Sequence, residues 1–445
     1  MLNKIFSRKY PYLKLLIRFF QVEKTVLNMS KKSDEKADKL NKELLTMKKK
    51  LSSLEKGYKK EFNTLKDNLD IYDGRVNLLT NALALSDREK VNEKLASTKC
   101  KNIVLTTYPT YTTGNVGDAM ITDAFVKLIK EHNENFEYVR VFRGESLDKL
   151  DMQHVKNIFA PGFSVSPNTY PKNYKLFAET NKLKNFNFVP FGCSYQHFVP
   201  QNSSFSKEFY DDNSIEFLKD LSGVAPIPCR DRKITEMLMS MGIDAFYVGD
   251  LVLFDPEYIN TGYFGNKEIK KVAFTIQHKA KYCEQSKSIL TMLRQKFGSD
   301  VKIFVTLHGA HSAITKKVIA HAKTLDMEIV ELFGESENLS FYDDVDLHVG
   351  YRLHGHISVL RRRKPSILLV EDARAFGFSA TSETSYGCFQ AMDGNKVSEK
   401  ALEEVQLFLE ESLESEFKDY QKVFDFIDTQ YNEVIYPYFS KLVVN

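Results

Sequence analysis

The stretch at residues 347–356 reads Leu-His-Val-Gly-Tyr-Arg-Leu-His-Gly-His. Its first four residues form a short apolar run that predicts a buried strand, and a helical pattern begins at Leu353. A strand that leads through a polar turn into a helix is the repeating unit of a parallel α/β sheet. Arg352 and His354 then lie at the start of the helix, where the backbone amides and the helix dipole favour an anion.

Other segments of the chain share this pattern of an apolar run, a polar turn and a helix. Ligands of open parallel sheets bind beyond the carboxyl ends of the strands, so polar residues that follow such runs are candidates for a site. The predicted strands are Asn102–Thr107, Asn157–Ala160, Phe186–Phe191, Val224–Pro228, Ala245–Val248, Val272–Gln277, Val301–Leu307, Leu347–Gly350 and Ser366–Val370.

The predicted strands fall into two groups joined near residues 257–270, which indicates two Rossmann-like halves with a cleft between them. We therefore expect an α/β protein with an N-terminal coiled-coil helical extension and a C-terminal helical tail. The expected parts are an arm at 1–28, a coiled coil at 29–98, a first Rossmann-like domain at 100–262, a second at 263–385, and C-terminal helices at 386–445.

The first hundred residues differ in charge from the rest of the chain. They hold 23 Lys and Arg against 13 Asp and Glu, a net charge of +10, whereas the remainder carries −7. The arm at 1–28 is also rich in large apolar side chains, and a segment of this kind can lie in a membrane interface. We expect it to contact a membrane surface. The alternative is an arm that packs on the body or on a partner helix.

Residues 33–95 contain no proline and carry apolar residues in alternating steps of four and three, which is the heptad pattern of a coiled coil. Such a stripe predicts self-association, so we expect a homo-oligomer. The alternative is one long helix folded against its own body. The seam residues are Leu40, Leu44, Met47, Leu51, Leu54, Tyr58, Phe62, Leu65, Leu69, Tyr72, Val76, Leu79 and Leu83.

Composition and motifs exclude several classes of protein. The chain is 43% hydrophobic and 27% charged, which is ordinary globular usage, and no apolar run is long enough to cross a membrane. The five cysteines form no Cys-x-x-Cys pair, so we expect free thiols in a reducing, cytoplasmic compartment. We find no metal-ligand set, no Gly-x-Ser-x-Gly elbow and no Walker loop. We expect no metal ion, no cofactor and no nucleic-acid partner.

The candidate site residues all follow predicted strands. A histidine beside a strand is usually a core residue, but several at one sheet edge weaken that interpretation. Arginines suit planar anions because their guanidinium groups bind them at two points. The candidates are Asn115, Gly117 and Asp118 after the first strand, Arg230 and Asp231 after the strand at 224–228, and His278, His308, Arg352, His354 and Arg374 after strands of the second half.

Simpler roles remain open for two of these residues. Arg230 could serve only to form an ion pair with Asp231, its neighbour in the sequence. Asp118 could be only the cap of the helix that follows it.

Three segments of the chain resemble the polysaccharide pyruvyl transferase family. The segment 114–121 (Gly-Asn-Val-Gly-Asp-Ala-Met-Ile) is similar to the family's N-x-G-D-x-x-I opening. The segment beginning Arg230-Asp231-Arg232 resembles its R-D-x-x-S-x-x-L-x-x-x-G motif. Arg352-Leu353-His354-Gly355 resembles its R-L-H core, and Arg374 stands where the family has a lysine. The resemblance covers residues 100–385.

The resemblance implies a two-domain fold like that of GT-B glycosyltransferases, with the acceptor on the first domain and the donor on the second. It implies transfer of the enolpyruvyl group from phosphoenolpyruvate to a saccharide of a cell-envelope polysaccharide or its lipid-linked precursor, giving a pyruvate ketal. Arg230 and Arg352 would bind the donor, and His354 would be the acid and base. Asn115 and Asp118 would orient the acceptor or the loop.

Two other functions remain open on the sequence. One is a GT-B-like glycosyltransferase that holds the diphosphate of a nucleotide sugar in the same cleft. The other is a non-catalytic coiled-coil scaffold, suggested by departures from the family pattern at Ala160 and Leu251.

Overall fold

The computed structural model describes residues 34–107, 114–170, 174–195, 210–263, 265, 268–309, 312–394 and 396–444. The arm expected at 1–28 lies outside the described residues. The chain divides into two compact units, with the boundary between Leu85 and Ser86.

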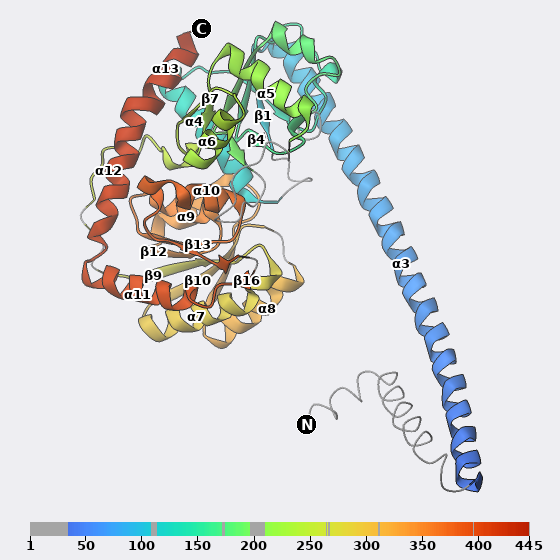
Figure 1. Ribbon diagram of the computed structural model, residues 1–445. Helices are drawn as coiled ribbons and strands as arrows, with labels where there is room; N and C mark the ends of the chain where they lie inside the picture. Colours follow the sequence, from blue (N-terminus) through green and yellow to red (C-terminus); the bar gives the residue numbers. More distant parts are fainter. Residues whose placement is uncertain are drawn as a thin grey trace. The chain divides into compact units, whose positions relative to one another are not determined.

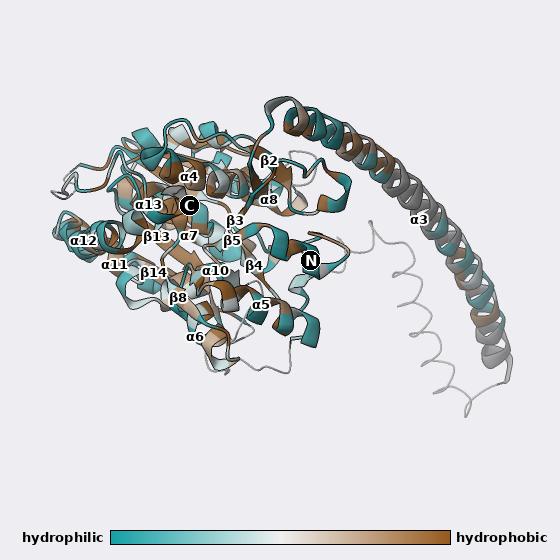
Figure 2. Cartoon of the chain, turned by 90° about the horizontal axis from the view of Figure 1, so that it is seen from above, coloured by the Kyte–Doolittle hydropathy of each residue, from teal (hydrophilic) through white to brown (hydrophobic). Residues whose placement is uncertain are grey.

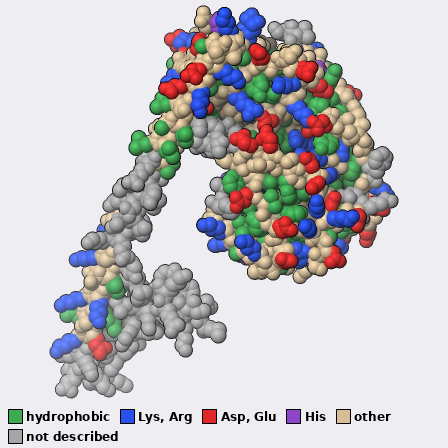
Figure 3. All heavy atoms as spheres, turned by 180° about the vertical axis from the view of Figure 1, so that it is seen from behind, with side chains coloured by type: hydrophobic (Ala, Val, Ile, Leu, Met, Phe, Trp, Pro, Cys, Tyr) green, Lys and Arg blue, Asp and Glu red, His purple; other side chains and the backbone are tan. Residues whose placement is uncertain are grey.

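The first unit contains most of one long helix, α3 (Asp34–Thr98), which confirms that the proline-free segment is helical. Its seam residues Val76, Leu79 and Leu83 are 59%, 63% and 41% exposed. Apolar and polar residues alternate along the helix (Figure 2), and several basic side chains project from its lower part in Figure 3. Pairing with a second helix stays a prediction. No described helix is long and apolar enough to span a membrane.

The last turns of α3 belong to the second unit and pack on its first sheet. Val91 and Leu95 are buried in the same core as the strands of that sheet. Arg88 forms an ion pair with Glu145, with 2.9 Å between Nη2 and Oε1. The expected alternative, a helix packed on its own body, therefore describes residues 86–98.

The second unit contains a first parallel sheet in the order β2-β1-β3-β5. Beside β5 lies a parallel pair of strands, β7 and β8. An isolated backbone β-bridge between residues 193 and 229, both free cysteines, links this pair to the sheet. Val224 ends a helix rather than starting a strand, so β7 begins later than expected. The strands are β1 (Asn102–Thr106), β2 (Val139–Phe142), β3 (Asn157–Pro161), β5 (Asn187–Phe191), β7 (Ile227–Cys229) and β8 (Ala245–Tyr247).

The second sheet is also parallel, in the order β11-β10-β9-β12-β13-β14. Residues from 386 onward, expected to be helical, begin instead with β14, which pairs with β13 as the sixth strand of this sheet. The strands are β9 (Lys271–Thr275), β10 (Lys302–Leu307), β11 (Glu328–Glu331), β12 (Leu347–Gly350), β13 (Ser366–Val370) and β14 (Cys388–Gln390).

Helices cover both sheets, and the last ones return toward the first sheet (Figure 1). Phe439 of the final helix is fully buried, and its ring centroid lies 5.5 Å from that of Phe125 and 5.1 Å from that of Phe191. The helices are α4 (Val116–His132), α5 (Asp212–Val224), α6 (Arg232–Ser240), α7 (Cys283–Phe297), α8 (Ala313–Thr324), α9 (Leu353–Leu360), α10 (Ala373–Ala380), α11 (Ala401–Glu414), α12 (Gln421–Gln430) and α13 (Tyr436–Val444).

The two parallel sheets with covering helices confirm the expected α/β fold class with two Rossmann-like halves. Ligands of such sheets bind beyond the carboxyl ends of the strands, so each half has a candidate binding region at that edge.

Candidate functional site

The carboxyl edges of the two sheets meet at the start of α4. The amide of Val116 donates a hydrogen bond to the carbonyl oxygen of His308, at 3.2 Å. The amide of Gly334 donates to the carbonyl oxygen of Gly114, also at 3.2 Å. Backbone bonds therefore hold the polar corner of the first half against the strand ends of the second.

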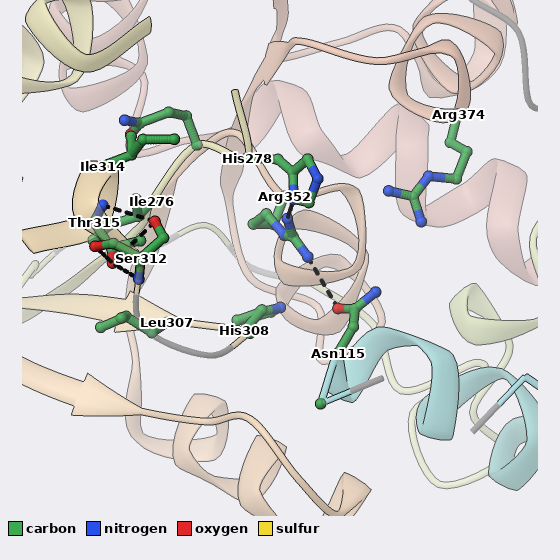
Figure 4. A pocket seen from close by; sticks show the side chains of 13 residues that line it. Asn115, Ile276, His278, Leu307, His308, Ser312, Ile314, Thr315, Arg352 and Arg374 are labelled. Atoms are coloured by element: carbon green, nitrogen blue, oxygen red, sulfur yellow. Dashed lines mark hydrogen bonds between the residues drawn. The ribbon is translucent and has the colours of Figure 1, made fainter. Parts of the chain in front are cut away.

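Arg352 connects the two halves through its side chain (Figure 4). It precedes α9, and its Nη2 donates to Oδ1 of Asn115 at 3.0 Å. Its Nη1 lies 2.9 Å from Nδ1 of His278. A guanidinium can only donate, so this imidazole nitrogen accepts the bond. Burial, and then the charges of Arg352 and Arg374, lower the pKa of His278 from its ordinary value.

A cavity of about 370 Å³ opens at the carboxyl edge of the second sheet (Figure 4). It contains Arg352 and Arg374 together with hydroxyl, amide and apolar side chains. Its lining residues are Gly114, Asn115, Ile276, Gln277, His278, Leu307, His308, Gly309, Ser312, Ile314, Thr315, Arg352 and Arg374.

A smaller cavity of about 60 Å³ lies at the carboxyl edge of the first sheet. Arg230 and His354 both line it, although they come from different halves, and Arg374 lines both cavities. Its lining residues are Thr107, Asp118, Ile121, Thr122, Arg143, Pro161, Gly162, Ser164, Ser194, Arg230, His354 and Arg374.

His354 is a buried imidazole whose Nε2 has no hydrogen-bond partner. Burial, and then the charges of Arg374 and Arg230, lower the pKa of His354 well below its ordinary value. The side chain is therefore neutral near pH 7. Gly117 permits its position, because a Cβ atom at residue 117 would lie 2.3 Å from Nδ1 of His354.

Arg230 follows β7 and is also buried. Its Nε lies 3.9 Å from a carboxylate oxygen of Asp231, and its Nη1 lies 3.7 Å from one of Asp250. These distances are too long for hydrogen bonds, and Nη2 of Arg230 has no partner at all. An ion pair with Asp231 therefore does not satisfy this guanidinium.

Asp231 has a structural position. Its carboxylate accepts a hydrogen bond from the amide of Ile234 at 2.9 Å and so caps α6. Burial raises the pKa of Asp231 to about 6. It is absent from the lining of both cavities in the described part of the chain.

A cluster of charged residues, Glu371, Asp372 and Arg374, follows strand β13. Arg374 and Asp372 form an ion pair at 2.7 Å, and the Asp372 charge raises the pKa of Arg374. Burial acts to raise the pKa of Asp372, but the Arg374 guanidinium, the amide of Ala375 and the charge of Arg352 together outweigh it, so the pKa is lowered. Burial raises the pKa of Glu371 to about 7, and its carboxylate accepts a bond from the His278 amide at 2.7 Å.

His308 lines the larger cavity, and its Nε2 lies 2.7 Å from the hydroxyl of Tyr342. Burial, and then the charge of Arg352, lower the pKa of His308 well below its ordinary value. The imidazole is therefore neutral and held by the core.

Sequence reasoning missed Arg143, which lines the smaller cavity. Its Nη1 donates to the hydroxyl of Ser164 at 2.8 Å, and its guanidinium lies 5.5 Å from the ring centroid of Tyr174. Arg143 follows β2, the one strand of the first sheet that the pattern search did not recognise. Recognising Val139–Phe142 as a strand would have identified it by the same rule as Arg230.

Across the described ranges, no group of three or more His, Cys, Asp and Glu could hold a metal ion.

The fold and these cavities define a class: an α/β protein with two Rossmann-like halves and arginine-lined cavities where the halves meet. The family model "Polysaccharide pyruvyl transferase" matches residues 115–372, which contain most of this site. The chain belongs to the polysaccharide pyruvyl transferase family, and so to a family of transferases. A search of curated proteins found no match.

Solved structures with similar folds share little sequence with the chain. Accessory secretory proteins 1, 2 and 3 of Streptococcus pneumoniae match with a TM-score of 0.37 and 11% identity. That match covers 64% of this chain and about half, 52%, of the other. S. aureus MnaA with UDP gives 0.48 and 10%, over 78% and 95% of the two chains. The wall teichoic acid polymerase TagF gives 0.42 and 12%, over 83% and 96%.

Proposed function

We propose that the protein transfers the enolpyruvyl group of phosphoenolpyruvate to a saccharide, forming a pyruvate ketal and releasing phosphate. The observation that carries the proposal is the smaller cavity. There Nη2 of Arg230 and Nε2 of His354 are both buried, both without a partner, and supplied by opposite halves. A buried guanidinium nitrogen without a partner favours a bound anion, and a buried neutral imidazole can accept a proton and return it.

The donor carries a phosphate and a carboxylate, so it needs more than one cation. Arg230 and Arg352 bind it from the two halves, and Arg374, which reaches both cavities, contributes a third charge. Asp118 lies in the smaller cavity and orients an acceptor hydroxyl. Asn115 and His278 hold the Arg352 guanidinium in place.

The reaction balances with two acceptor hydroxyls. His354 takes the proton from the first hydroxyl as that oxygen attacks C2 of the donor, and the imidazolium then delivers the same proton to the methylene carbon, which becomes a methyl group and leaves His354 neutral again. The second hydroxyl oxygen then displaces phosphate at C2, and its proton leaves with the phosphate. A positioned acid and base contributes roughly 10²–10⁴-fold to such a reaction.

The saccharide is a sugar of a surface polysaccharide or of its lipid-linked precursor. This part of the proposal rests on the family and on the basic, apolar arm at 1–28, which would bring the enzyme to the cytoplasmic face of a membrane. We also propose a homo-oligomer formed through α3.

Phosphate release tests the proposal. The protein is incubated with phosphoenolpyruvate and candidate saccharides, and phosphate is measured over time. We expect release that depends on the saccharide and falls at least 10²-fold in His354→Ala. His154→Ala, a half-buried histidine outside both cavities, is the matched control. Equal rates for wild type and His354→Ala would refute the mechanism.

A nucleotide sugar is the second candidate donor, favoured by the size of the larger cavity, which lies within the range of small-molecule sites. The change in melting temperature on adding each ligand distinguishes the two candidate donors. Stabilisation by UDP or GDP sugars, without stabilisation by phosphoenolpyruvate, would replace the first proposal with this one.

A further inference from the structure

The heptad positions of α3 can be assigned over residues 40–83. Leu40, Met47 and Leu54 occupy d positions, and Leu44 and Leu51 occupy a positions. The step from Tyr58 to Phe62 adds four residues, after which the alternation resumes. The glycines at 57 and 74 fall at g and f, outside the seam, so they do not interrupt it.

The residues that flank the seam carry a second pattern. In a parallel, in-register pair of helices, each g residue faces the e residue five positions later on the other helix. All the pairs in which both residues are charged combine opposite signs between residues 40 and 83. These pairs are Glu43 with Lys48, Lys50 with Glu55, and Glu61 with Lys66.

Three consecutive seam residues are exposed in the part of the helix whose side chains the structure describes. Val76, Leu79 and Leu83, which are consecutive a, d and a positions, are 59%, 63% and 41% exposed. An exposed apolar row of this kind marks an interaction surface. No d position carries isoleucine, so the sequence lacks the pattern that shifts the preference to three or four strands.

We infer that residues 40–83 of α3 bind the same segment of a second copy of this chain as a parallel, in-register, two-stranded coiled coil. The occupant of the stripe is a second copy because the flanking charges complement those of an identical helix in this register. The inference is independent of the reaction, since it uses none of the site residues.

Charge reversal tests the pairing in the full chain. Sedimentation of wild type should give a dimer. Lys50→Glu and Glu55→Lys should each weaken the dimer roughly tenfold, because each change turns two attractive contacts per dimer into repulsive ones. The double variant should regain wild-type affinity within about threefold. Lys49→Glu, the same change at an f position, should have no effect.

A mass of one chain, or of more than two, would overturn the inference. So would single reversals that leave the affinity unchanged, or a double variant as weak as the singles.

Cysteine pairing tests the direction of the helices. Met47→Cys and Leu79→Cys, both at d positions near opposite ends of the segment, should each link two chains under mild oxidation. Lys49→Cys and wild type, whose five cysteines are buried or half-buried, should not. An antiparallel pair would bring residue 47 close to residue 76 instead. Failure of both variants to cross-link while the protein is dimeric would therefore overturn the parallel arrangement.

Discussion

The chemistry proposed for the site depends on a histidine that stays neutral among arginines. His354 is buried, and the nearby Arg374 and Arg230 disfavour a second positive charge on its ring. A bound anion would favour that charge again, so the donor itself raises the pKa of His354. The same residue can therefore accept a proton and later release it.

The pH dependence of kcat/KM for phosphoenolpyruvate tests this account, because it reports the free enzyme. A lowered pKa keeps His354 neutral to lower pH, so activity should fall only as pH drops below the ordinary histidine value of about 6.5. Glu371, whose pKa is about 7, titrates nearby, so Glu371→Gln is the control and should keep the same acid limb. An acid limb above 6.5 in both proteins would contradict the account.

Arg143 should contribute to binding of the donor. Because it lines the smaller cavity beside Arg230, Arg143→Gln should raise KM for phosphoenolpyruvate by about tenfold or more, as expected for one lost hydrogen bond to a charged group. Arg140→Gln is the control, because Arg140 lies within β2, the strand that Arg143 follows, but lines neither cavity. Steady-state kinetics that show equal KM values for the two variants would remove Arg143 from the site.

Gly117 should be as important as the histidine that it accommodates. A methyl group at this residue would overlap the His354 ring, so Gly117→Ala should reduce kcat by roughly 10²-fold through misplacement of the imidazole. Gly223→Ala, where a Cβ atom meets nothing within 4 Å, is the control. Unchanged turnover in a folded Gly117→Ala protein would contradict the geometry.

Most of the candidate residues could be predicted because one rule, polar residues after buried strands, applies to both sheets. Arg230, Arg352 and His354 follow that rule. Their assignment to two cavities could not be predicted, because it depends on how the halves meet. The rule also cannot distinguish a ligand-facing carboxylate from a cap, and Asp231 is a cap.

At the scale of elements, the strands with continuous apolar runs were predictable, and the missed ones share a physical reason. β11 reads Glu-Ile-Val-Glu at a sheet edge, and β14 has three residues that are only half-buried. Such strands form because a neighbouring strand offers hydrogen bonds, so tertiary context rather than local pattern determines them. β2, with the sequence Val-Arg-Val-Phe, was missed as well, and it also lies at the edge of its sheet.

The arm at 1–28 should act as a separate element. If its basic and apolar residues hold the protein to anionic lipid, deleting residues 1–28 should move the protein from the membrane fraction to the supernatant while sparing turnover on soluble acceptors. Fractionation of cell lysates checks this expectation. An unchanged distribution, with the deletion confirmed, would count against a membrane-binding arm.

At the scale of the whole molecule, the C-terminal helix returns to the first half. Phe439 packs fully buried against Phe125 and Phe191 of the first half. Phe439→Ala should lower the free energy of unfolding by about 3 kcal/mol, the usual cost of removing a buried aromatic ring. Leu407→Ala, at a residue 56% exposed, should change it little. Urea unfolding measures the free energy of unfolding of both variants. Equal losses in the two would show that Phe439 of α13 does not stabilise the core.

The central claim is that Arg230 of one half and His354 of the other act on the same donor molecule. A crystal structure of the protein with phosphoenolpyruvate or a non-transferable analogue tests it most directly. The account predicts an anionic group of the donor within hydrogen-bond distance of Arg230 Nη2, and the reacting carbons beside His354 Nε2. A donor bound elsewhere, with both nitrogens still unpartnered, would contradict it.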